Sequence, residues 1–137
     1  MKLAKLMNSS DKMRKINSRF VKVVQFKIGK DRYGLPTAVA KTYTPIEYTV
    51  TRRLQPARDQ NRYVSSIKFL DRALNVKVSC SCPDYCFRFE VANHEAGASD
   101  IKYSNGEMPT TTNADMQPGL CKHLIALRKI VKDKYNV

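Results

Sequence analysis

The chain of 137 residues contains no tryptophan, only two histidines and only 12 acidic residues. It also lacks any apolar run that approaches the roughly 20 residues of a membrane helix. Its first twenty residues hold scattered lysines and no unbroken apolar segment, so they do not match a secretory signal peptide. These absences predict a protein with no membrane span in a reducing, non-secreted compartment. In such a compartment clustered thiols bind metals more often than they form disulfides.

The common catalytic signatures are absent as well. The sequence contains no H-E-x-x-H, no H-x-E paired with P-C-x-x-C, no phosphate-binding G-x-x-x-x-G-K-[ST] and no dinucleotide-binding G-x-G-x-x-G. His94 with Cys86 is the only spare histidine–cysteine pair for a thiol enzyme. We therefore expect a protein that is not an enzyme and that takes no small-molecule substrate.

Positive charge is abundant and unevenly distributed. The chain carries 25 Lys and Arg residues and a formal net charge of +13. Residues 1–32 hold ten basic residues against two acidic ones, whereas residues 83–119 hold six acidic residues against two basic ones. A basic excess favours anionic partners, with nucleic acid first. Two alternatives explain the same charge: a surface that is only solvated, or a surface that binds an acidic protein.

The pattern of apolar and turn-forming residues predicts one α+β domain over residues 20–137, preceded by a basic arm over residues 1–19. The arm is expected to contain a short helix capped by Ser9 or Ser10, which orders only against another surface. The domain is expected to combine a small antiparallel sheet with a C-terminal amphipathic helix. The expected strands cover 20–28, 38–54 with a break at Pro45, 63–71 and 75–82; the expected helices cover 84–96, between Asp84 and Gly97, and 120–135; the expected loops cover 55–63 and 97–119.

Two periodicities locate the expected core. Apolar residues and cysteines alternate along the last expected strand, so they share one face. Apolar residues in the C-terminal helix recur at helical spacing. The strand positions are Val76, Val78, Cys80 and Cys82; the helix stripe is Leu120, Leu124, Leu127 and Val131; Ile67 and Phe69 complete the core.

The cysteines are gathered in two stretches, VKVSCSCPDYC and LCKHL, which also hold one of the two histidines. Cys80 and Cys82 form a pair at the end of a strand, and Cys121 and His123 form a pair at a helix start. Zinc prefers four sulfur and imidazole ligands in a tetrahedron. A helix start adds unpaired N–H groups and positive potential that favour thiolates. We therefore predict that these four side chains hold one Zn²⁺ that clamps the strand to the helix.

Other readings of the cysteines stay open. Cys86 is the main rival ligand, because it can replace Cys82 or Cys121, although we favour it as a core residue. His94 lies in an acidic stretch and fits a surface histidine, or one that supports a ligand. A disulfide is awkward between cysteines only two residues apart, and plain buried thiols are the remaining alternative. A closed set of four ligands leaves no open position for a catalytic water, which argues against a catalytic zinc.

The Cys-x-Cys…Cys-x-His pattern resembles the SWIM-type zinc finger, a ββα unit whose ligands follow this order. The matching positions are Cys80, Cys82, Cys121 and His123, and the resemblance covers residues 63–135. The 38 residues between the two pairs form a longer gap than is usual in that family. The resemblance implies a Zn²⁺ cofactor held by these four residues.

The strings CSCPDY, GASDIKYSNGEMP and QPGLCKHLIAL resemble a group of small tailed-bacteriophage proteins that are commonly classed with virion structural proteins. That resemblance implies a structural component of the neck, tail or baseplate that contacts other protein subunits, in the virion and in the host cytoplasm during assembly. The alternative is a SWIM-like regulatory protein that binds nucleic acid. The residues expected to contact DNA or another anionic partner are Lys12, Arg14, Lys15, Arg19, Lys122, Arg128 and Lys129.

Overall fold

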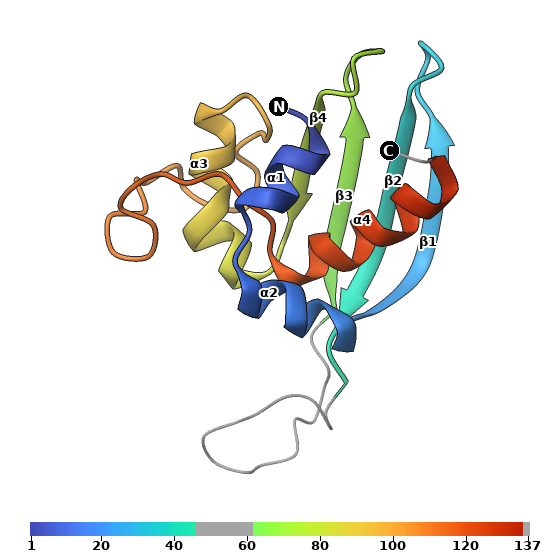
Figure 1. The fold of residues 1–137 in the computed structure, drawn as a ribbon. Coiled ribbons are helices and arrows are strands. Elements are labelled where there is room, and N and C mark those ends of the chain that lie inside the picture. Colours follow the sequence, from blue (N-terminus) through green and yellow to red (C-terminus); the bar gives the residue numbers. More distant parts are fainter. Residues whose placement is uncertain (46–61, 136–137) are drawn as a thin grey trace.

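The computed structural model describes residues 1–45 and 62–135, and it has the predicted α+β fold (Figure 1). Four antiparallel strands form one sheet, and their order in the sheet, β1-β2-β3-β4, is also their order along the chain. The strands are β1 (Lys22–Lys30), β2 (Pro36–Tyr43), β3 (Tyr63–Phe69) and β4 (Val76–Cys80). The helical segments are α1 (Leu3–Ser9), α2 (Lys12–Asn17), η1 (Ser18–Phe20), η3 (Tyr85–Phe89), α3 (Glu90–Glu95) and α4 (Lys122–Tyr135).

Three of the four predicted strands, at 20–28, 63–71 and 75–82, are confirmed as β1, β3 and β4. β2 accounts for the first part of the stretch predicted over 38–54, and it ends before Pro45. The remainder of that stretch and nearly all of the connection predicted over 55–63 fall on residues 46–61, which lie outside the described residues.

Alternating burial gives the sheet two different faces. Ala38, Ala40 and Thr42 of β2 are buried, whereas Val39 and Lys41 between them are exposed. Helix α4 lies across the face that is buried, and α1 and α2 lie on the same side of the sheet (Figure 1). The predicted core positions of β3 and β4 are all buried on this side: Ile67, Phe69, Val76, Val78 and Cys80.

A bulge in β1 changes which face of the sheet the residues after it occupy. Val24 pairs with Lys41 and Lys27 pairs with Val39, so β1 uses three steps where β2 uses two. Gln25, inside the bulge, has φ +48°, in the left-handed region that an extra residue in a ladder commonly needs. Because Lys41 and Val39 share a face, Val24 and Lys27 share that face too.

The amphipathic helix predicted over 120–135 is confirmed as α4. Its predicted stripe is buried, with Leu124, Leu127 and Val131 inside and Leu120 immediately before the helix. Lysines in its last turn suit the negative end of the helix dipole. Within residues 1–45 and 62–135, no helix is both long and apolar enough to cross a bilayer.

The N-terminal segment differs from the predicted arm because it packs onto the domain itself. It forms α1, α2 and η1, and the side chains of Leu3 and Leu6 are buried in the main core. The N–H of Val76 donates to the carbonyl of Met1 at 2.9 Å, which ties the chain start to β4. The segment was predicted to order only against another surface. In the structure that surface is the core of the same chain.

The predicted cap of the short helix is also wrong. Asp11 caps α2, because its Oδ1 accepts the N–H of Arg14 at 2.8 Å. Ser9 and Ser10 bind elsewhere: the Ser10 hydroxyl accepts the N–H of Leu120 at 2.9 Å. The serines therefore join the N-terminal segment to the chain just before α4.

The segment 84–96 is helical, as predicted, with a π-helical turn, η3, followed by α3. Gly97 ends it with φ +75° and donates its N–H to the carbonyl of His94 at 3.0 Å. Asp84 does not cap the helix. Its carboxylate instead accepts two hydrogen bonds from the guanidinium of Arg14, at 2.6 and 2.8 Å, because α2 brings that arginine alongside.

The loop predicted over 97–119 contains no helix or strand, and the buried carboxylate of Glu90 holds part of it. This carboxylate accepts the N–H groups of Lys102 and Ser104, both at 2.9 Å, and the hydroxyl of Ser104 at 3.0 Å. A partner molecule is therefore not needed to order this part of the loop.

Candidate metal centre

The four predicted ligands converge at one buried point between β4 and α4. Cys80, Cys82, Cys121 and His123 each offer one ligand atom, and these atoms all lie within 4.8 Å of one another. All four residues are buried, with exposed fractions of 4% or less. Tetrahedral ligands at zinc distances lie about 3.5 to 4 Å apart, so a small contraction of the cluster closes it around an ion.

The first pair comes from the end of β4 and the start of the next helix. Cys80 is the last residue of β4 and points to the buried face. Cys82 occupies the cap of the helix: its carbonyl accepts the N–H of Cys86 at 3.0 Å, and its sulfur accepts the N–H of Tyr85 at 3.4 Å. Pro83 follows it, in the position where a missing N–H costs nothing. A hydrogen bond with Cys121 lowers the pKa of Cys82, but hydrogen bonding to Cys80 and burial outweigh it, so the pKa is raised.

The second pair belongs to the start of α4. The carbonyl of Cys121 accepts the N–H of Ile125 at 3.0 Å, so Cys121 is the residue from which the helix begins. His123 lies in the first turn. The two helices of this region thus begin at two ligands, Cys82 and Cys121.

A buried amide holds the chain that leads into Cys121. The side chain of Asn93 accepts the N–H of Gly119 at 3.0 Å and donates to the carbonyl of Gly119 at 2.9 Å. Asn93 also donates to the hydroxyl of Tyr85 at 3.2 Å, and that hydroxyl donates to the carbonyl of Val78 at 3.0 Å. The sequence did not predict roles for Asn93 and Tyr85, because their hydrogen-bond partners are distant in sequence and no local pattern indicates them.

Hydrogen bonds distribute the protons of the three thiols unevenly. Burial opposes ionisation of Cys80, but hydrogen bonds from Cys121, Cys82 and Ser65 hold the pKa of Cys80 well below its usual value. The hydroxyl of Ser65, directly opposite Cys80 in the sheet, lies 3.3 Å from its sulfur. Burial, followed by hydrogen bonding to Cys80, raises the pKa of Cys121. Binding of a divalent cation would displace the remaining protons and relieve this imbalance.

The surroundings of His123 bear on whether the cluster fits a metal ion. Its ring Nδ1 is buried and has no hydrogen-bond partner among the described residues. The ring packs against Tyr63, with a centroid separation of 5.1 Å. A buried nitrogen without a partner costs about 1–3 kcal/mol, and coordination of this nitrogen by a metal would remove that cost. Three sulfurs and one imidazole nitrogen are the donor set of a soft or borderline divalent ion.

The rival ligands lie outside the cluster. Cys86, expected in the core, is half-buried, and its thiol donates a weak bond to the carbonyl of Cys80 at 3.8 Å. Burial raises the pKa of Cys86 to about 11. His94 is exposed, as expected of a surface histidine, and its Nδ1 lies 3.0 Å from the carbonyl of Ser99. All four cysteines are free thiols, so no disulfide forms.

The residues expected to contact an anionic partner are spread over α2, η1 and α4. Lys12, Arg19 and Lys129 are exposed. Arg14 is engaged by Asp11 and Asp84 of the same chain, which leaves it less free for a partner than predicted. The remaining three, Lys15, Lys122 and Arg128, are half-buried.

No protein-family model, no curated protein and no solved structure matches this chain. The resemblances to SWIM-type fingers and to phage structural proteins therefore stay predictions. The cluster of three cysteines and one histidine stands on the geometry alone.

Proposed function

We propose that Cys80, Cys82, Cys121 and His123 bind one Zn²⁺ and that this ion has a structural role. The observation that carries the proposal is a buried set of three sulfurs and one imidazole whose ligand atoms all lie within 4.8 Å of one another. Zinc suits such a set because it accepts thiolates, prefers a tetrahedron and undergoes no redox chemistry.

The ion would link the end of β4 to the start of α4, in addition to the apolar core that these elements share. Cys80 and Cys82 end a hairpin, whereas Cys121 and His123 follow the long loop 97–119. Structural zinc sites in small domains contribute about 10 kcal/mol or more to folding at neutral pH. That contribution adds to the hydrogen bonds of the loop, which supply about 1 kcal/mol each.

The same geometry supports a protein that is not an enzyme. Four protein ligands leave no position for a metal-bound water. The buried carboxylate nearest in sequence, Glu90, already accepts the backbone of residues 102–104, so it is not available as an acid or base.

Metal analysis of two matched cysteine variants tests this site. We expect the purified wild-type protein and the Cys86→Ser variant to contain one zinc per chain, and the Cys121→Ser variant to lose it. The two variants make the same chemical change, so they separate a ligand from a neighbouring thiol. Zinc loss in Cys86→Ser with retention in Cys121→Ser would refute the ligand set.

We further propose that the chain acts as a structural or adaptor protein that contacts other subunits, in the virion of a tailed bacteriophage. The virion assignment depends on the resemblance of three sequence segments. Support for subunit contacts comes from the exposed apolar side chains of Phe87, Tyr103 and Met108, on η3 and the loop that Glu90 holds. Exposed apolar groups in one region commonly mark a protein interface.

Mass spectrometry of purified particles tests this assignment. A structural component should be retained through density-gradient purification and high-salt washing at a constant ratio to the other virion proteins. Its presence only in the lysate, and never in washed particles, would contradict the assignment.

The second candidate function is binding of nucleic acid. It is favoured by the net charge of +13 and by the composition of the sheet, whose four strands contain six lysines and no acidic residue. A steep fall in affinity for oligonucleotides with rising salt would support it, because phosphate contacts release counterions.

A further inference from the structure

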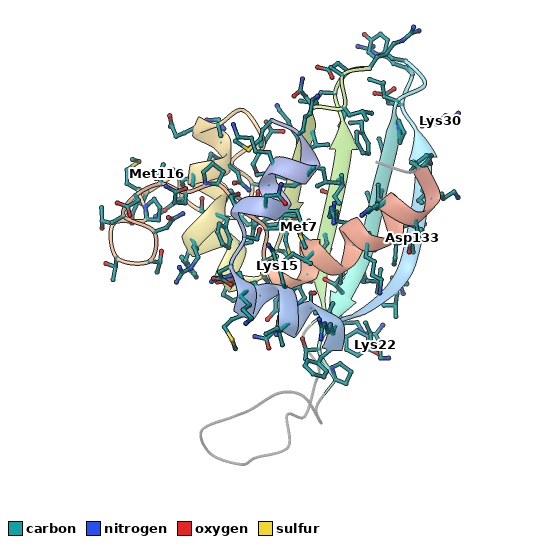
Figure 2. All side chains as sticks on the ribbon, viewed as in Figure 1. Met7, Lys15, Lys22, Lys30, Met116 and Asp133 are labelled. Atoms are coloured by element: carbon teal, nitrogen blue, oxygen red, sulfur yellow. The ribbon has the colours of Figure 1, made fainter. Side chains whose placement is uncertain are left out.

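The face of the sheet that turns away from α4 carries a concentrated positive charge. Cross-strand pairs in an antiparallel sheet project to the same side. The register therefore gathers on this face Lys22, Lys27, Lys41, Lys68 and Lys77. Arg62, two residues before Val64, continues the same alternation. Figure 2 shows the helices, with Lys15 on α2 and Asp133 on α4, on the other side of the sheet.

This charge is nearly uncompensated. In the part of the chain that the structure describes, one of these lysines pairs with a carboxylate: Lys77, whose Nζ lies 2.8 Å from Asp100 in the loop after α3. Lys68 and Lys77 stand directly opposite each other in the register. Like charges in that position destabilise a sheet. Ordinary solubility is served by mixed charges, so a face of one sign points to an anionic ligand.

The same face also offers flat surfaces that suit bases. Tyr43 lies two residues beyond Lys41 on β2, and the guanidinium of Arg62 stacks over its ring at 4.9 Å. Val39 and Val64, between the lysines, are 45% and 39% exposed. Single-stranded nucleic acids bind to a basic surface that tracks the phosphates and to aromatic rings on which bases stack. An acidic protein would need the lysines but would have little use for the half-buried aromatic ring beside them.

We propose that this open face, formed by Lys22, Lys27, Lys41, Lys68, Tyr43 and Arg62, binds single-stranded nucleic acid. The lysines contact phosphates, and the Tyr43–Arg62 pair stacks on a base. The inference deepens the second candidate function by assigning its surface, and it does not depend on the phage assignment. It also places the contacts away from α2 and α4, where the sequence alone placed them.

Fluorescence anisotropy with a labelled oligothymidylate and an oligouridylate of equal length tests the surface, using the full zinc-loaded chain. The sheet variant is Lys41→Gln with Lys68→Gln, and the matched control is Lys12→Gln with Lys129→Gln, which removes two exposed lysines from the helical side. We expect the sheet variant to bind about tenfold more weakly and its slope of log affinity against log salt to fall by about 1.4, since each phosphate contact contributes about 0.7. The control should retain wild-type affinity.

Tyr33 provides a matched control for substitution of the Tyr43 ring. Tyr33, at the tip of the β1–β2 hairpin, carries Arg32 at 4.9 Å, the same pairing off the sheet face. Tyr43→Leu should weaken binding roughly five- to hundredfold, as expected for one stacked base, and Tyr33→Leu should not. Unchanged zinc content and circular dichroism show that each variant is folded.

Several outcomes would overturn the proposal. Loss of affinity in the Lys12/Lys129 control but not in the sheet variant would show that nucleic acid binds to the helices and not to the sheet face. Equal affinity for polyglutamate, with no effect of Tyr43→Leu, would identify an acidic protein partner. Equal affinity for duplex DNA, again with no effect of Tyr43→Leu, would identify a duplex ligand. Absence of binding to both oligonucleotides would exclude the surface as a site for single strands, and absence of binding to duplex DNA as well would exclude the second candidate function. The relative affinities for the two oligonucleotides distinguish DNA from RNA.

Discussion

Tyr85 donates its backbone N–H to the sulfur of Cys82 at 3.4 Å and its hydroxyl to the carbonyl of Val78 at 3.0 Å. One tyrosine therefore links the turn that carries the second ligand to the strand that carries the first, Cys80. Its side chain is completely buried, so these bonds form away from water, where they are most effective. The cluster is thus supported by secondary structure on each side.

Removal of the metal should destabilise the whole domain rather than the site alone. Treatment of the zinc-loaded protein with 1,10-phenanthroline should lower the melting temperature sharply or abolish the cooperative transition, because about 10 kcal/mol of binding free energy is coupled to folding. Circular dichroism during a thermal scan measures this, and added zinc should restore the transition. An identical melting curve for verified metal-free protein would contradict a structural role.

Cys86 should be the one cysteine that alkylates in the metal-bound protein, and only slowly. Burial raises its pKa to about 11, so at neutral pH its thiol is protonated and weakly nucleophilic. Its rate of reaction with iodoacetamide should rise about tenfold per pH unit until the pH approaches 11, as the thiolate fraction grows. Peptide mapping locates the label, with unfolded, metal-free protein as the control that labels at all four cysteines. Labelling of Cys121 before Cys86 in metal-bound protein would be inconsistent with the site.

Asn93→Asp should destabilise the protein by about 1–3 kcal/mol without removing a ligand. The substitution keeps the acceptor for the N–H of Gly119, but it removes the donor to the carbonyl of Gly119 and buries a charge. Urea denaturation measures the loss, and Asn105→Asp, at an exposed loop position, is the control that should be neutral. Equal stability of the two variants would mean that the amide does not hold the chain before Cys121.

Much of this fold follows from local periodicity. The alternation from Val76 to Cys80 places the first thiol inward, and the spacing from Leu120 to Val131 gives the buried face of α4, whereas Cys82 lies beyond β4 at the start of the next helix. The two ligand pairs were predictable because each pair is close in sequence, so the geometry within a pair follows from a strand or a helix start.

Other features depend on contacts between distant residues, and local patterns do not reveal them. Ser10 could have capped a helix or bound any nearby N–H group, and only the folded chain selects Leu120. Leu3 and Leu6 form a stripe too short to predict a core contact. The bulge at Gln25 shifts the face of Lys27, so alternation counted along the sequence places that lysine on the wrong side. The basic sheet face was missed because it is assembled across four strands.

Gly119→Ala should destabilise the protein through one contact. A Cβ at this position would lie 2.8 Å from Cε1 of Phe89, whose ring is buried and also lies under the guanidinium of Arg14 at 5.0 Å. Because the ring is buried, it has little room to move away from an added methyl group, and overpacking of this kind costs about 1–3 kcal/mol. A shift of the backbone that relieves the contact would also disturb the start of α4, so zinc affinity should fall together with stability.

A double-mutant cycle with Phe89→Leu separates this clash from a general effect of alanine. The smaller side chain makes room for the methyl group, so the cost of Gly119→Ala should be lower in the Phe89→Leu background by about 1 kcal/mol or more. Thermal denaturation and competition with a zinc chelator give the two readouts. Additive costs in the two backgrounds would show that Gly119 is required for another reason, and that Phe89 does not fix the path of the chain into Cys121.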